Sequence, residues 1–241
     1  MTIKALIPVR SGSVRVKNKN IAPFAGSSLL EIKIKQLKRI AELDGVVVNS
    51  NSDEMLEIAR RLGAETVKRD EYFATSSVAI SDVYEDMAKH LDCDTVLFAD
   101  ATNPMIEDET VHKVIELYKH RDNTYDSVMT ATPVKMFLYW NCKPINYTED
   151  KKPRSQDLPD ILALNSALHI LPREMMQKKK SIVGYLPKLY PVSRVEGIDI
   201  DDPIDFAFAE FIYNQKVLTG GGVYVVFIFN SPRRSVLRQA A

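Results

Sequence analysis

The sequence is short of the residues that support several common functional classes. It contains only two cysteines, Cys93 and Cys142, which are too few for a disulfide framework or a cysteine metal cluster and which fit a reducing compartment. The 32 Lys and Arg residues are balanced by 32 Asp and Glu residues. This balance gives no electrostatic reason to expect nucleic acid or an anionic membrane as a partner.

Long apolar runs and several catalytic motifs are also missing. No stretch approaches the roughly 18 apolar residues that a membrane helix needs, and the apolar run near the N-terminus is too short for a secretory signal. We therefore expect a soluble, cytoplasmic protein. The sequence has no HxxxH, CxxC or G-x-S-x-G motif. Its first loop reads RSGS rather than G-x-G-x-x-G, which disfavours a dinucleotide oxidoreductase.

The first strong pattern is an apolar strand at Ile3–Val9 that runs directly into a basic loop. The loop carries small residues and cations but no acid: Arg10, Ser11, Gly12, Ser13, Arg15, Lys17 and Lys19. Small residues let backbone N–H groups approach a ligand, and cations suit an oligophosphate. Because open α/β sheets bind ligands at the carboxyl ends of their strands, we interpret this loop as a triphosphate cradle. The simpler interpretation is a solvated basic turn.

Extended and helical patterns alternate after this loop. We expect strands at 46–48, 64–67, 95–98, 127–132, 162–171 and 189–191. We expect one helix that follows a cap at residue 27 or 28, and further helices at 54–62, 80–91, 108–117 and 172–179 and from about 202. This alternation predicts an α/β fold with a mostly parallel sheet and helices on both faces. The prolines and aromatics of Pro133–Pro159 interrupt it and predict an inserted β-rich arm. The chain thus divides into a domain at 1–217 and an atypical tail at 218–241, whose apolar run at 223–229 is expected to form a strand.

Six segments, taken in order, resemble one protein family. They are IPVRSGSVRVKNKNI, VVVNSNSDEMLEIARRLGAETVKRD, TNP at Thr102–Pro104, RSQDLP, LNSALHI and GIDIDDPIDF. Their order and spacing resemble the cytidylyltransferases that activate 3-deoxy-2-keto sugar acids, which include the CMP-sialic acid synthetases and their legionaminate, pseudaminate and KDO relatives. The resemblance runs from about Ile3 to Tyr213. It implies a Rossmann-like nucleotidyltransferase fold of the GT-A-like type, with the inserted arm forming a homodimer.

The resemblance also implies a reaction, in which CMP passes from CTP to a sugar acid and pyrophosphate is released. Such a transfer depends on positioning and on neutralising phosphate charge more than on covalent catalysis. Cationic side chains and a divalent metal, here Mg²⁺, are the expected sources of positive charge. The expected partners are therefore CTP and a sugar acid, with Mg²⁺ as the cofactor.

The resemblance assigns roles to individual residues around the nucleotide. Arg10, Ser13 and Lys19 would contact the triphosphate, Asn20 would lie beside the nucleotide, and the cytosine is expected near Ala74 and Ser76. Asp199 and Asp201 would hold the magnesium; their i, i+2 spacing puts both on one side of an extended segment, and paired hard oxygens suit this ion. Arg10, Lys19 and Asp201 are the expected catalytic residues. Asp202 or Asp205 is expected to cap the final helix.

The acceptor contacts are expected from the loop after residue 98, from the arm and from the strand at 162–171. They are Asp100, Thr102, Arg154, Gln156 and Asn165.

Several positions depart from the family pattern. Asp100 stands where sialate enzymes have Gln, Ser166 replaces a Gly, and Arg15 or Lys17 would replace a missing lysine. A carboxylate at position 100 would repel a carbonyl or an anion and prefer a hydroxyl or an amine, so the acceptor need not be N-acetylneuraminate.

Other functions stay open at this point. A legionaminate, a pseudaminate, another ulosonate or an aminophosphonate could be the acceptor. A nucleotidyltransferase or glycosyltransferase of similar fold could use another nucleotide, and a catalytically silent nucleotide-binding protein could keep the same scaffold. Retention of Arg10, Lys19, Asp199 and Asp201 disfavours the silent protein.

Overall fold

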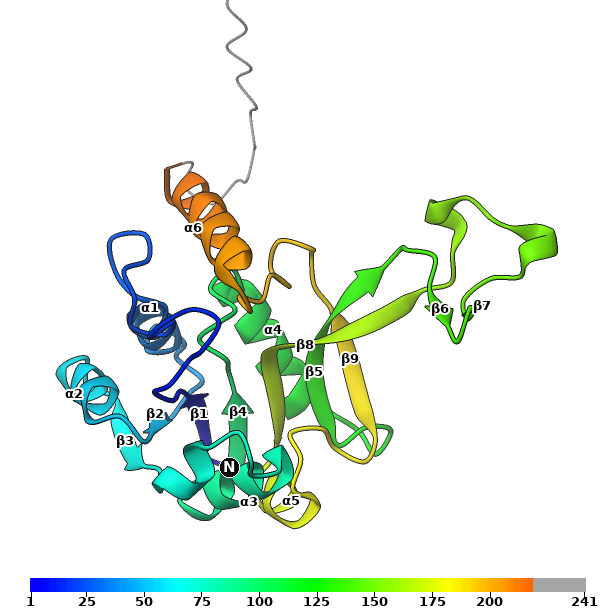
Figure 1. The fold of residues 1–241 in the computed structure, drawn as a ribbon. Helices are drawn as coiled ribbons and strands as arrows, with labels where there is room; N and C mark the ends of the chain where they lie inside the picture. Colours follow the sequence, from blue (N-terminus) through cyan, green and yellow to red (C-terminus); the bar gives the residue numbers. More distant parts are fainter. Residues whose placement is uncertain (219–241) are drawn as a thin grey trace, which may run out of the picture.

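A seven-stranded sheet with the order β3-β2-β1-β4-β8-β5-β9 forms the centre of the molecule (Figure 1). The computed structural model describes residues 1–218, so the expected strand at 223–229 lies outside the described residues. The strands are β1 Ile3–Pro8, β2 Gly45–Ser50, β3 Glu65–Lys68, β4 Thr95–Phe98, β5 Ser127–Val134, β8 Ile161–Pro172 and β9 Pro187–Pro191. All neighbouring pairs are parallel except those of β8, which runs antiparallel to β4 and β5. The predicted, mostly parallel sheet is therefore confirmed.

The helices begin within a few residues of their predicted starts. They are α1 Leu29–Leu37, α2 Asp53–Arg61, α3 Ile80–Lys89, α4 Asp108–Lys119, α5 Arg173–Lys179 and α6 Pro203–Leu218, with 3₁₀ turns η1 Glu71–Ala74, η2 Glu149–Lys151 and η3 Ser155–Asp157. The Ser28 hydroxyl accepts from the Glu31 N–H at 3.3 Å, which satisfies one of the free donors at the start of α1. Within residues 1–218, none of these helices combines the length and the hydropathy that crossing a bilayer requires.

Helices cover both faces of the sheet, as predicted. Alternate residues of β1 point to opposite faces, so Ala5 and Ile7 pack in one apolar cluster and Leu6 in another. The first cluster includes residues of α1, α2 and α4, and the second includes residues of α3 and α5. The sheet is thereby fixed from both sides, and its strand ends carry the loops described below.

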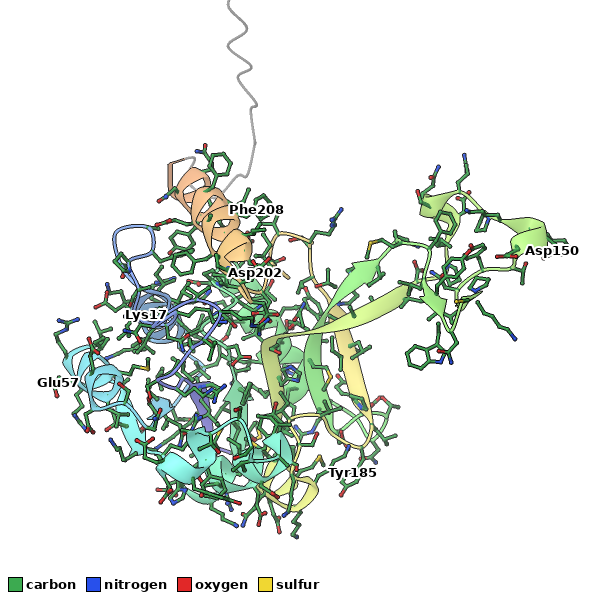
Figure 2. The ribbon with its side chains drawn as sticks, in the orientation of Figure 1. Lys17, Glu57, Asp150, Tyr185, Asp202 and Phe208 are labelled. Carbon is green, nitrogen blue, oxygen red and sulfur yellow. The ribbon has the colours of Figure 1, made fainter. Side chains whose placement is uncertain are left out.

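The inserted segment forms an arm that stands away from the body (Figure 1). β5 and β8 lead into it, and it carries a separate two-stranded sheet of β6 Tyr139–Trp140 and β7 Lys143–Pro144. Figure 2 shows Asp150 near its far end. Four large apolar side chains of the arm are exposed: Met136, Tyr139, Trp140 and Ile145. The predicted arm is confirmed, although its own strands are only two residues long.

Candidate active site

A cleft of about 600 Å³ opens where β1 and β4 end. These strands are parallel, so the loops that follow them meet at the same edge of the sheet. The loop after β1, residues 69–84, the loop after β4 and the acidic segment before α6 all contribute to the lining. The predicted site residues among its lining residues are Arg10, Ser13, Lys19, Asn20, Ser76, Asp100, Thr102, Asp199 and Asp201.

The basic loop after β1 is held at its beginning by side-chain hydrogen bonds. The Asn51 side chain accepts from the Ser11 N–H at 3.0 Å and donates to the Ser11 hydroxyl at 2.7 Å. Gly12 has a φ of +78°, in the left-handed region that favours glycine. The Arg10 guanidinium donates to the carbonyl of Ala74 at 2.6 Å, which ties the loop to the segment predicted to recognise the base.

The acidic segment before α6 is held along its backbone. The N–H of Ile200 donates to the carbonyl of Thr102, and the Asn103 amide donates to the carbonyl of Ile198, both at 3.0 Å. Ile200 is fully buried. Because alternate residues of an extended segment face opposite sides, Asp199 and Asp201 are turned to the cleft that they line.

The start of α6 shows which carboxylates cap the helix. Asp202 accepts from the N–H groups of Ile204 and Asp205 at 2.8 and 2.9 Å. Asp205 reaches back and accepts from the N–H groups of Asp201 and Asp202 at 3.0 and 3.1 Å. This reciprocal arrangement confirms the predicted capping, and both Asp202 and Asp205 take part in it. Figure 2 labels Asp202 at the beginning of the helix.

The basic loop and the acidic segment meet across the cleft. The Lys19 ammonium donates a hydrogen bond to the carbonyl of Ile200, and Arg15 forms an ion pair of 2.8 Å with Asp201. Both partners of the ion pair are more than half exposed. The cations from the beginning of the fold and the carboxylates from near its end therefore line one cavity. Arg15, at a position that departs from the family pattern, pairs directly with one of those carboxylates.

Carboxylates crowd this part of the cleft, and their pKa values reflect it. Burial raises the pKa of Asp199, and the charge of Asp201 raises it further, while Thr102 and Lys19 act in the opposite direction. Burial and the charge of Asp199 raise the pKa of Asp100 to about 7, against the opposing charges of Lys33 and Lys19. Neighbouring carboxylates of this kind are stabilised in their charged forms when a cation lies between them.

The donor set fits a hard divalent ion that keeps other ligands. Within residues 1–218, no group of three or more His, Cys, Asp or Glu side chains is arranged to hold a metal by itself. Asp199 and Asp201 supply carboxylate oxygens, which suit Mg²⁺, and this ion commonly takes its remaining ligands from phosphate and water. The two residues could therefore bind Mg²⁺ together with an oligophosphate.

Arg69 is a lining residue that the sequence analysis did not single out. Its side chain is buried and donates to the side-chain and backbone oxygens of Asn49 at 2.6 and 3.1 Å. Burial, followed by the charge of Arg10, lowers the pKa of Arg69 to about 10. Its position in the segment VKRD was visible in the sequence, but nothing local distinguishes this arginine from the solvated ones nearby.

Three predicted acceptor residues do not lie among the described residues that line the cleft. Arg154 is in the arm and pairs with Asp157 at 2.7 Å, and Gln156 is in the same short turn. Asn165 is buried between β8 and β5, where it accepts from Thr130 at 2.5 Å and donates to Thr132 at 2.8 Å. Their acceptor contacts stay predictions.

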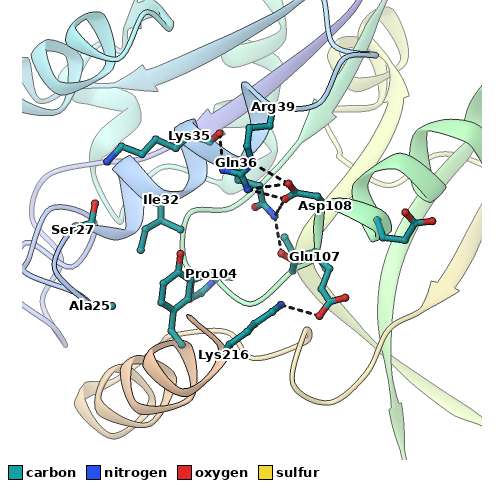
Figure 3. A pocket seen from close by; sticks show the side chains of 13 residues that line it. Ala25, Ser27, Ile32, Lys35, Gln36, Arg39, Pro104, Glu107, Asp108 and Lys216 are labelled. Atoms are coloured by element: carbon teal, nitrogen blue, oxygen red, sulfur yellow. Dashed lines mark hydrogen bonds and ion pairs between the residues drawn. The ribbon is translucent and has the colours of Figure 1, made fainter. Parts of the chain in front are cut away.

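A second hollow, of about 830 Å³, lies between α1, the loop before α4 and α6 (Figure 3). Four of its charged side chains form two ion pairs: Arg39 with Asp108 at 2.9 Å and Lys216 with Glu107 at 2.9 Å. Gln36 also donates to Asp108 at 3.0 Å. These five side chains are already engaged with one another, so the cleft beside the basic loop is the stronger candidate for binding a charged substrate.

Comparison with known proteins agrees with this choice. The model of the cytidylyltransferase family matches residues 4–157, which include the basic loop and most of the arm. Post-translational flagellin modification protein B of Campylobacter coli is 26% identical over 229 residues, covering 90% of this chain and 97% of that protein. The CMP-N,N'-diacetyllegionaminic acid synthase of Legionella pneumophila is 28% identical over 235 residues, covering 90% and 100%. The resemblance found in the motifs is thereby confirmed.

Solved structures support the fold independently. A CMP:2-keto-3-deoxy-manno-octonic acid synthetase complexed with CTP superimposes with a TM-score of 0.70 at 13% identity. The match covers 90% of this chain and 100% of that one. At such low identity the similarity concerns the fold, and it confirms the predicted Rossmann-like nucleotidyltransferase architecture.

Proposed function

The chain belongs to the cytidylyltransferase family, and we propose that it transfers CMP from CTP to a 3-deoxy-2-keto sugar acid with release of pyrophosphate. One observation carries this proposal: Lys19 and Arg15 reach across the cleft to the acidic segment, so cations and carboxylates surround one space. The relatives support the choice of acceptor, because the Legionella protein is named as a synthase of a CMP-linked sugar acid.

In the proposed reaction, the side chains of the basic loop bind and orient the triphosphate. Arg10 and Lys19 neutralise phosphate charge, and Ser13 with the loop backbone supports the same groups. The anomeric hydroxyl oxygen of the acceptor forms a bond to the α-phosphorus and gives up its proton, while the bond to the pyrophosphate oxygen breaks. The protein contributes mainly the alignment of the attacking and leaving oxygens.

We assign the metal role to Asp199 and Asp201. When bound there, Mg²⁺ would neutralise charge on the phosphate oxygens. Two observations of the cleft support the assignment: both carboxylates line it, and the pKa of Asp199 is raised by burial and further by the charge of Asp201. The backbone bonds of the acidic segment to Thr102 and Asn103 would keep both carboxylates in place before the ion binds.

The arm supports a homodimer as the working form of the protein, which we place in the cytoplasm. Its exposed apolar side chains, including Tyr139 and Trp140, need a partner surface to be covered. Arg154 and Gln156 lie in the arm, which stands away from the body of its own chain (Figure 1). In a dimer these two residues could reach the acceptor in the cleft of the second copy. Sedimentation of Trp140→Glu against the wild type tests this assembly: we expect the substitution to dissociate a dimer, and a monomeric wild type would contradict it.

The proposed activity is tested by pyrophosphate release. The purified protein is incubated with Mg²⁺, one nucleotide triphosphate and a panel of ulosonic acids and aminophosphonates. We expect release that requires both CTP and an ulosonic acid, and we expect CTP to raise the melting temperature more than ATP, GTP or UTP does. Release that prefers another nucleotide, or no stabilisation by CTP, would refute the proposal.

A further inference from the structure

Helix α1 carries a lysine and a glutamine on the side that faces the interior of the protein. Lys33 and Gln36 are three residues apart, so they are neighbours on the helix surface, and both side chains are buried. Burying such polar side chains is unfavourable unless their hydrogen bonds are made. The Lys33 amino group donates to the Gln36 side chain at 3.1 Å. Their other hydrogen bonds show what the pair holds in place.

The pair holds the backbone of the loop between β4 and α4. The Lys33 amino group donates to the carbonyl of Asn103 at 3.0 Å. The Gln36 amide donates to the carbonyl of Ile106 at 2.7 Å, and Figure 3 shows it reaching Asp108 at the start of α4. Asn103 and Ile106 are buried, so their carbonyls depend on donors from the protein. Side chains of α1 therefore fix the course of this loop.

The same loop holds the acidic segment before α6. The Asn103 side-chain amide donates to the carbonyl of Ile198 at 3.0 Å. The N–H of Ile200 donates to the carbonyl of Thr102, also at 3.0 Å. These two contacts bracket Asp199, and the Thr102 hydroxyl donates to the Asp199 carboxylate. Asn103 thus contacts α1 through its backbone and the acidic segment through its side chain.

Helix α1 is joined to the basic loop as well. The N–H of Leu30, in the first turn of α1, donates to the carbonyl of Asn20 at 2.9 Å. Lys33 follows Leu30 by three residues and lies one turn further along the helix. One helix therefore contacts both the end of the basic loop and the support of the acidic segment. The spacing between the cations and the carboxylates of the cleft depends on this helix.

We propose that Lys33 is a positioning residue: acting through Asn103, it holds the carboxylates of the acidic segment where a metal and the triphosphate on the basic loop can be bound together. This inference rests on the proposed cytidylyltransferase activity. Because Lys33 is fully buried, it acts on the reactants only through its protein contacts. A displacement of the carboxylates by a fraction of an ångström would weaken metal binding and slow the transfer. The alternative is a purely structural role, in which Lys33 only satisfies a buried carbonyl.

Calorimetry of CTP binding with and without Mg²⁺ tests this role and requires no turnover. The variant Lys33→Met removes the donor and keeps most of the side-chain volume. The control Thr95→Val removes a buried hydrogen bond with Tyr118 at the other end of β4. We expect Mg²⁺ to strengthen CTP binding by about tenfold or more in the wild type and the control, but by less than about threefold in Lys33→Met. The metal-free affinity of Lys33→Met should stay close to that of the wild type.

A double-mutant cycle tests the route through Asn103. Asn103→Ala should itself reduce the gain from Mg²⁺, and Lys33→Met should reduce it little further in that background, because both changes act on one path. Lys33→Gln is a second variant in case Lys33→Met folds poorly. Its side chain stays polar but is one bond shorter, so it does not reach the Asn103 carbonyl, and we expect the same loss of the gain from Mg²⁺.

A purely structural role predicts a different result. The inference is overturned if the Lys33 variants have lower melting temperatures but keep the wild-type gain from Mg²⁺, or if the effects of Lys33→Met and Asn103→Ala on this gain are fully additive. A wild type that binds CTP with Mg²⁺ yet releases no pyrophosphate would refute the proposed function alone. A wild type that binds no CTP would refute both.

Discussion

The two walls of the cleft are built in different ways. The basic loop at residues 10–20 is tied to Asn51 at its beginning and exposes Val14 almost completely, at 94%. The acidic segment at 198–202 has backbone bonds to Thr102 and Asp205 and a fully buried Ile200 in its middle. The acidic wall thus has a buried residue in its middle, whereas the basic wall has an exposed middle between the contacts of Arg10 and Ser11 at one end and of Lys19 at the other.

This difference suggests a division of roles. A fixed pair of carboxylates can define where a metal and the reacting phosphate lie, because reaction rates depend on placement within fractions of an ångström. A loop of cations with an exposed middle can adjust to the triphosphate and gain order there from phosphate contacts. We therefore expect substitutions in the acidic wall to affect turnover and substitutions in the basic wall to affect CTP binding.

The largest effect is expected from the acidic wall. Asp201→Ala should lower kcat by about 10² to 10⁴ with the fold intact, because a misplaced metal removes several kcal/mol of charge stabilisation. Steady-state pyrophosphate release, with circular dichroism to check folding, gives the answer. Asp53→Ala serves as the matched carboxylate deletion and should retain full activity. Normal turnover of Asp201→Ala would contradict the division of roles.

An effect of pH on stability is expected from a buried histidine that packs against a residue of the cleft lining. His169 of β8 packs edge-on against Phe98, which lines the cleft, and burial lowers the pKa of His169 to about 4. In the unfolded chain the His169 imidazole takes up a proton near pH 6.5, whereas in the folded protein it does so only near pH 4. The free energy of unfolding therefore falls by about 3 kcal/mol in total as the pH is lowered from above 6.5 towards 4. Urea unfolding of the wild type and His169→Gln at pH 7 and pH 4 measures this. An equal acid-induced loss in both proteins would exclude His169 as its source.

A binding effect is expected from the basic wall. Arg10→Ala should raise the KM for CTP by about tenfold to hundredfold and leave kcat largely unchanged, since a charged hydrogen bond to phosphate contributes on the order of 1.5 to 3 kcal/mol. Initial rates at varied CTP with saturating acceptor separate the two constants. Arg60→Ala, on the exposed face of α2, is the control. A fall in kcat with an unchanged KM for CTP would show that Arg10 affects turnover, as the acidic wall is expected to do, and not CTP binding.

Each wall of the cleft is supported by the side-chain amide of one asparagine, so the two asparagines can be compared directly. Asn103→Ala removes the bond to the carbonyl of Ile198, and Asn51→Ala removes the bonds to Ser11. Each should cost about 1 to 3 kcal/mol of stability. Asn103→Ala should raise the Mg²⁺ concentration needed for half-maximal rate, whereas Asn51→Ala should raise the KM for CTP. Identical kinetic profiles for the two variants would contradict the proposed difference in role between the acidic wall and the basic wall.

The smallest effect is expected where the walls touch. Arg15→Ala breaks the ion pair with Asp201, but both side chains are more than half exposed. Exposed pairs contribute about 0 to 1 kcal/mol, so the melting temperature should change little. Activity should change by only a few fold, because Lys19 still contacts the acidic segment. A loss comparable to that of Asp201→Ala would show that Arg15 acts directly on the substrate.

Much of the fold could be predicted because its signals are local. The Ser28 cap, the buried run at β4 and the capping of α6 by Asp202 and Asp205 each depend on neighbouring residues. The antiparallel direction of β8 could not be predicted, since it is set by pairing with β4 and β5 far away in the sequence. The resemblance places Arg10 and Lys19 with Asp199 and Asp201 around one nucleotide, and the contact of Lys19 with the acidic segment agrees with it. The ion pair of Arg15 with Asp201 was not predicted.

The parts of the site that escaped prediction involve burial. Lys33 stands in LLEIKIKQL, where a lysine normally marks the solvated face of a helix, and only the packing of α1 shows that it is buried. Arg69 is hidden in the same way among charged neighbours. Asn165 was predicted to face the acceptor, but its hydrogen bonds to Thr130 and Thr132 depend on the register between β5 and β8.

The measurement that tests the account most directly is the affinity for CTP with and without Mg²⁺, determined by calorimetry for the wild type and for the double variant Asp199→Asn, Asp201→Asn. We expect Mg²⁺ to strengthen CTP binding by the wild type at least tenfold, and we expect the double variant to lose this gain while keeping its metal-free affinity. Equal affinity of the wild type in both conditions, or a gain that survives in the double variant, would contradict a cleft in which cations and carboxylates enclose a metal-bound CTP.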